Sequence, residues 1–86
     1  MERFHFHIHG KRSVQDRDGT ELAHLGQARA EALKVLGQTL VYQSSDFWEH
    51  QSLEVRVTDA AGLTLFSVTA VALDAPASAP TKPSLN

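Results

Sequence analysis

Residues 3–9 read Arg-Phe-His-Phe-His-Ile-His, and Gly10 follows them. Apolar and polar side chains alternate here without interruption, so three apolar groups face one way and three imidazoles the other: Phe4, Phe6 and Ile8 against His5, His7 and His9. A β-strand has a side-chain period of two, so this pattern predicts a half-buried strand. The apolar side requires a cover, and we interpret the rest of the chain as supplying it.

The length of the chain predicts one small domain. A chain of 86 residues buries only ~60% of its unfolded surface, so its core is marginal. The absence of cysteine excludes disulfides and thiolate metal sites and fits a reducing compartment. The net charge is −2 and no segment forms a basic stripe, so we do not expect nucleic-acid binding. We expect neither a secretory signal nor a membrane span of ~20 apolar residues, and a cytoplasmic location.

A helix is predicted from about His24 to Gln43. Apolar residues recur there at steps of three and four residues, which places them in one apolar stripe along the helix surface: Leu25, Ala28, Ala32, Val35, Leu36 and Leu40. Before it, Gly10-Lys11 is a plausible tight turn into a short return strand ending at Gln15, and residues 16–19 form a loop. After it, the aromatic pair Phe47-Trp48 is expected in a loop.

A second hairpin is predicted near the C-terminal end. Residues 53–58 alternate, residues 59–62 have the composition of a turn with glycine at positive φ, and residues 63–71 return. If Val57 faces Thr64, the returning strand places Phe66, Val68 and Ala70 in the core and leaves Leu63, Leu65 and Val71 on the far face.

The order is therefore β-β-α-β-β, an α+β two-layer sandwich in which one helix covers one face of a four-stranded antiparallel sheet. We expect this single domain to span residues 1–73. Residues 74–86 are rich in Pro, Ala and Ser and are predicted to form a disordered tail.

The uncovered face of the sheet could bind a metal through its histidines. A His-x-His pair sets two imidazoles ~6.6–7 Å apart at Cα, but His5 and His9 are ~13 Å apart, so at most two of the three histidines can share an ion. A third ligand would have to come from elsewhere, such as Glu54. We therefore predict no metal site, although His5, His7 and His9 are the candidates, and no cofactor.

The same face could instead contact another protein. An apolar patch on a sandwich with one helix usually marks a contact surface, and edge strands offer a second route. We expect a homo-oligomer or a small protein partner, and the candidate partner-binding residues are His5, His7, His9, Arg56, Leu63, Leu65 and Val71.

Catalysis is not expected. The chain holds no Gly-x-Ser-x-Gly elbow, phosphate-binding loop or His-Glu-x-x-His motif. A domain of this size also lacks room beside its core for a pocket of ~300 Å³. We predict a protein that is not an enzyme.

The chain holds several landmarks in a fixed order: Arg3-Phe4-x-Phe6-His7, Asp16-x-x-Gly19-x-Glu21-Leu22, Ala28-x-x-Glu31-Ala32, Phe47-Trp48 and Leu53-x-Val55-x-Val57-x-Asp59-x-x-Gly62-x-x-Leu65-Phe66. Together they resemble a small bacterial family, the domain of unknown function 6894. The resemblance covers about residues 1–72, implies a short cytosolic protein and carries over no catalytic residue. The chain departs from the pattern at His5, where an aromatic is usual, and at His9, where an acid often sits.

A weaker likeness is to antitoxins of the HicB kind, which run a hairpin into a Gly-bearing loop and a helix with Glu-Ala-Leu, here Glu31-Ala32-Leu33. Such proteins have a partial RNase H fold and bind a small toxin, so the likeness implies a regulator of this class. The proline-bearing loop and the DNA-binding segment typical of them are missing here.

Overall fold

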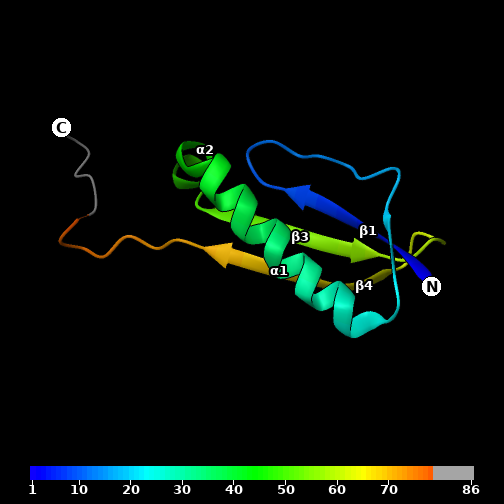
Figure 1. Cartoon of the computed structure of the whole chain (residues 1–86). Helices are drawn as coiled ribbons and strands as arrows, with labels where there is room; N and C mark the ends of the chain where they lie inside the picture. Colours follow the sequence, from blue (N-terminus) through cyan, green and yellow to red (C-terminus); the bar gives the residue numbers. More distant parts are fainter. Residues whose placement is uncertain (79–86) are drawn as a thin grey trace.

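A four-stranded antiparallel sheet and two helices build the fold (Figure 1), which confirms the mixed α+β class. The computed structural model describes residues 1–78, and residues 79–86 of the predicted tail lie outside this range. Along the chain the elements are β1 (Glu2–His9), β2 (Thr20–Leu22), α1 (Leu25–Tyr42), α2 (Ser44–His50), β3 (Ser52–Thr58) and β4 (Thr64–Val71). The strands lie in the order β2-β1-β3-β4.

The core lies between one face of this sheet and α1, as the alternation in β1 predicts. Phe4 is 1% exposed and Phe6 is 7% exposed, whereas the three histidines of β1 are half-buried on the opposite face. Val55 and Val57 of β3 bury completely, and Ala28 and Ala32 of α1 complete the cluster. Because these two alanines have short side chains, α1 can lie close to the sheet.

α1 begins and ends within one residue of the prediction. The N-cap is His24, whose Nδ1 accepts a hydrogen bond from the Gln27 backbone N–H at 3.3 Å. The buried stripe runs through Ala28, Ala32 and Thr39, with Val35 and Leu36 partly buried beside it. Thr39 satisfies its hydroxyl inside the helix by donating to the Val35 carbonyl at 2.7 Å.

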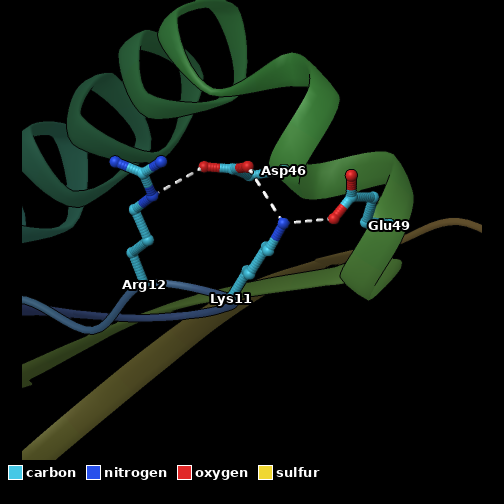
Figure 2. A network of polar contacts seen from close by, with 4 residues as sticks. All are labelled: Lys11, Arg12, Asp46 and Glu49. Carbon is cyan, nitrogen blue, oxygen red and sulfur yellow. Dashed lines mark hydrogen bonds and ion pairs between the residues drawn. The ribbon is translucent and has the colours of Figure 1, made fainter.

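The expectation of a single helix is wrong, because the segment predicted as a loop around Phe47-Trp48 folds into α2. The two rings meet edge to face with centroids 5.7 Å apart, and Trp48 remains 60% exposed. α2 contains no fully buried residue, and a network of ion pairs joins it to residues 11 and 12 (Figure 2). Arg12 Nε lies 3.0 Å from an Asp46 carboxylate oxygen, and Lys11 lies between Asp46, at 3.6 Å, and Glu49.

The predicted return strand, which follows the turn at Gly10-Lys11 and ends at Gln15, is also wrong. It is reduced to one bridge between Val14 and Ile8, in which each backbone N–H donates to the other residue's carbonyl at 2.9 Å. The strand that pairs with β1 is instead β2, opposite Glu2, Arg3 and Phe4.

The predicted register of the second hairpin is off by two residues. Val57 pairs with Phe66 and Val55 with Val68, and an irregularity between Val57 and Thr58 absorbs the extra residue before the turn. A shift of two keeps every side chain on its face, so Phe66 and Val68 still pack against the core. The turn closes as predicted, with Gly62 at a φ of +87°.

Within residues 1–78, neither helix is long and apolar enough to cross a membrane.

Candidate functional site

The face of the sheet that α1 leaves uncovered, which we call the histidine face, carries most of the predicted site residues. The register places His5 beside Thr58, His7 beside Arg56 and His9 beside Glu54. Arg56 donates to both carboxylate oxygens of Glu54, at 3.2 and 3.3 Å. Glu54, which the sequence offered as a further metal ligand, is thus engaged by the guanidinium.

His7 has a partner at each ring nitrogen. The Asp16 backbone N–H donates to Nδ1 at 3.1 Å, and Nε2 lies 3.0 Å from the Thr58 hydroxyl. Because Nδ1 accepts a hydrogen bond, the ring is neutral and its proton is on Nε2, which donates to Thr58. Burial lowers the pKa of His7, the nearby Asp16 opposes the shift, and His5, His9 and Arg56 add to it.

Asp16 is the residue around which this site is built. Its carboxylate accepts backbone N–H groups from Phe6 at 3.1 Å and from Gly19 at 3.0 Å, and its carbonyl oxygen lies 3.1 Å from His5 Nδ1. Burial would raise the pKa of the Asp16 carboxyl, but these two hydrogen bonds and the charges of His5 and His7 lower it overall.

Gly19 allows the loop to approach β1 this closely. Its φ is +74°, and an added Cβ would come within 2.9 Å of the Phe4 carbonyl and of the Arg3 side chain. Arg3 completes the attachment by donating to the Asp18 carbonyl at 2.8 Å and to Glu21 at 2.7 Å. The loop therefore forms one wall of the histidine face.

Two open grooves flank His7 on this face. Their volumes are about 490 and 430 Å³, and both are lined by His7, Gln15, Thr58 and Gly62. The expectation that the domain has no room for a hollow of ~300 Å³ is therefore wrong, because the loop of residues 13–17 stands beside the sheet and walls off these grooves. The first groove adds His9, Arg56 and the hydroxyls of Ser13 and Thr64, and the second adds His5 and Asp16. The first groove thus brings together His7, His9 and Arg56, three of the residues that the sequence offered as partner-binding candidates.

His7 is not oriented to activate the Thr58 hydroxyl as a nucleophile. A histidine that activates a hydroxyl must accept its proton, but His7 donates Nε2–H to Thr58. His5 directs Nδ1 at a carbonyl oxygen and stacks with His7, ring centroids 6.2 Å apart. Among residues 1–78, no three histidine or carboxylate side chains converge so that they could hold a metal ion.

The three predicted apolar contact residues are not part of the groove linings. Leu65 and Val71 belong to β4 and are 42% and 62% exposed, and Leu63 precedes the strand at the turn and is 66% exposed. None of the three lines either groove. Leu65 and Val71 instead follow the outer strand of the sheet.

Sequence reasoning missed Asp16 and Thr58 as members of the site. The Asp-x-x-Gly spacing indicated the turn that the Asp16 carboxylate closes through Gly19. Nothing in the sequence indicated the contacts of Asp16 with Phe6 and His7, because those residues are nine or more positions away.

A protein-family model matches this chain. No curated protein and no solved structure matches the chain. The model of a family described as a domain of unknown function, DUF6894, matches residues 3–72, a range that holds all the strands and helices described within residues 1–78 except Glu2, the first residue of β1. By this match over most of its length, the chain belongs to the DUF6894 family.

Proposed function

We propose that this protein is a non-enzymatic interaction module that binds another polypeptide through the histidine face or the adjoining strand edge. The observation that carries the proposal is β4, an outer strand that keeps Leu65 and Val71 exposed beside a face without a helix. Exposed apolar side chains along an outer strand that no other strand covers are typical of contact surfaces. The hydrogen bond from His7 to Thr58 supports a structural rather than a catalytic histidine.

Light scattering combined with native mass spectrometry tests this proposal at micromolar concentrations. We expect a mass above the 9.4 kDa of one chain, contributed by a second copy or by a small bound protein. Leu65→Asp should reduce that mass toward one chain, because a carboxylate would be buried at the contact.

Val41→Asp is the matched control, because Val41 is 80% exposed on α1, away from the sheet. It should leave the mass unchanged. A co-purifying small basic protein would assign the partner to the class that antitoxins of the HicB kind bind. A wild-type protein that is a monomer and carries no second polypeptide would disprove the proposed function.

A further inference from the structure

We propose that β4 pairs with β4 of a second copy of this chain, antiparallel and about a two-fold axis at Val68, which joins two four-stranded sheets into one. This inference rests on the proposed function and names its partner. Three features of β4 support it. Its outer edge is unpaired in the part of the chain that the structure describes, its sequence contains none of the residues that usually block pairing at an edge, and that sequence is self-complementary about Val68.

The two edges of the sheet differ. On the β1 side, β2 pairs with Glu2–Phe4, the Asp16 carboxylate accepts the Phe6 N–H, and Val14 bridges Ile8. That edge is therefore closed along most of its length. No segment within residues 1–78 pairs with the outer side of β4, which forms the other border of the sheet (Figure 1). In an antiparallel ladder every second residue of such a strand directs its N–H and C=O outward.

The composition of β4 does nothing to protect this edge. Residues 64–71 read Thr-Leu-Phe-Ser-Val-Thr-Ala-Val, with no charged residue, proline or glycine. Monomeric proteins usually protect a long edge strand with lysine, proline, a bulge or a covering segment. The irregularity opposite Val57 and Thr58 affects only the start of β4, and the pairing with β3 is regular from Phe66 to Val71. A regular, uncharged and unpaired edge of this kind can form a backbone ladder with a strand of another molecule.

Self-complementarity selects the register. With the axis at Val68, Phe66 lies opposite the small Ala70 of the second copy, and Ser67 lies opposite Thr69. Leu65 lies opposite Val71, so apolar groups meet apolar groups and hydroxyls meet hydroxyls on each face. Moving the axis to Ser67 sets Leu65 against Thr69, and moving it to Thr69 sets Ser67 against Val71. Both alternatives mix polar and apolar partners.

The position of α1 is compatible with the proposed pairing of two β4 strands. α1 contacts both β3 and β4, and the axis keeps the two copies of α1 on one side of the joined sheet. If each helix is centred over its β3–β4 pair, the two helices are two strand spacings apart, roughly 10 Å, which is a helix-packing distance. Leu33 of α1 is 61% exposed, and by helical spacing it shares one flank of α1 with Leu36 and Leu40, so α1 carries apolar surface beside its buried stripe.

A scan of single cysteines tests the register, because the chain has no cysteine of its own. Val68→Cys places two thiols directly across the axis, with Cα atoms about 4.5–5.5 Å apart and within disulfide range. In Ser67→Cys or Thr69→Cys the two thiols are diagonal neighbours, about 7–8 Å apart and beyond that range. In oxidised glutathione we expect the disulfide-linked dimer to form several-fold more completely with Val68→Cys than with either neighbour.

A charge pair tests the same register without a cross-link. Ser67→Lys combined with Thr69→Lys sets ammonium groups opposite each other across the axis, and we expect a monomer at micromolar concentration. Ser67→Glu combined with Thr69→Lys sets each carboxylate opposite an ammonium across the axis, and within each chain it sets the new charges opposite Arg56 and Glu54 of β3, which have the opposite sign. We therefore expect the dimer to return. Circular dichroism of both variants checks that each chain is folded.

The outcomes separate this inference from the proposed function. A cross-linking maximum at Val68, together with rescue by the Glu/Lys combination, supports the inference. A maximum at another position, or a dimer without any cross-link along residues 66–70, overturns it and leaves the proposed function standing. A monomer that carries a different bound protein does the same. A monomer without any bound protein overturns both.

Discussion

At the scale of single residues, Asp16 holds the loop between β1 and β2 against the sheet. Its carboxylate satisfies two backbone N–H groups, from Phe6 and Gly19, at a gap in the pairing of β1. Each buried donor left without a partner costs about 1–3 kcal/mol. The residue therefore acts as a substitute for a strand partner at this point of the edge.

We predict that Asp16→Ala lowers the free energy of unfolding by about 1–3 kcal/mol and that Asp16→Asn costs less, because an amide retains one acceptor oxygen. Chemical denaturation followed by circular dichroism measures both. Asp18→Ala is the control, because only the carbonyl of Asp18 is used, by Arg3. It should change the unfolding free energy by no more than about 0.5 kcal/mol. Equal losses for Asp16→Ala and Asp18→Ala would contradict this role.

His7 makes the stability depend on pH in a defined direction. Its pKa in the folded protein is lowered from 6.5 by burial, so between the folded and unfolded values the unfolded chain binds more protons. The contribution of His7 to stability is therefore complete above pH 6.5 and is lost as the pH falls through the lowered value. Protonation also removes the acceptor that Nδ1 offers to the Asp16 N–H.

We predict that the unfolding free energy of the wild type falls as the pH is lowered below 6.5, and that His7→Gln flattens this slope. The lowered pKa of Asp16 adds a separate loss, which begins only near and below 3.8. Denaturation at several pH values measures the total loss of stability, and titration of the His7 ring by NMR identifies the part that is due to His7. A His7 ring that titrates at or above 6.5 would show that the ring is not held neutral by its environment.

At the scale of elements, α2 is the least anchored part of the fold. It buries no residue, and the side chains that join it to the β1–β2 loop are Lys11 and Arg12 against Asp46 and Glu49. The pKa of Lys11 is raised, mainly by its hydrogen bond to Glu49. Ion pairs at an exposed position contribute little, typically 0–1 kcal/mol, and are weakened by salt.

We predict that Asp46→Asn, which removes the charge shared by both cations, speeds amide hydrogen exchange in α2 several-fold and leaves exchange in β3 unchanged. The global cost should be about 0.5–1 kcal/mol. Glu49→Gln removes only the Lys11 pair and should have a smaller effect on α2. If Asp46→Asn sped exchange equally in α2 and β3, α2 would be part of the cooperative core instead.

At the scale of the whole molecule, small size and an open sheet edge favour association. A domain of 86 residues can bury only a small core. At the open edge of the sheet, Phe66 and Val68 of β4 pack against this core but are only partly buried. A second copy that binds only the folded chain adds stability by mass action, so the melting temperature becomes dependent on protein concentration.

We predict that Tm of the wild type rises by about 5 °C or more when the protein concentration is increased a hundred-fold. The combination Ser67→Lys with Thr69→Lys should show no such rise. Differential scanning calorimetry at two concentrations measures both. A wild-type Tm independent of concentration would contradict self-association, whichever surface is considered.

The sequence by itself determined the layers of this protein. Strict alternation in residues 3–9 is enough to assign the faces of β1, because a strand places successive side chains on opposite sides. The three- and four-residue steps from Leu25 to Leu40 located α1 to within one residue at each end, because the helical period repeats over five turns. The same alternation predicted which residues of β4 face the core, since a register error of two preserves the face.

Only the tertiary structure decided the pairing partners and the candidate site. α2 is a short helix without a buried face, so its sequence has no apolar pattern that distinguishes it from a loop. Its ion pairs with Lys11 and Arg12 form only in the folded structure. The loop before β2 pairs with β1 at Val14 alone because the Asp16 side chain, rather than another strand residue, takes the Phe6 N–H. Contacts between residues far apart in the chain depend on where the backbone folds back, and local periodicity carries no information about that distance.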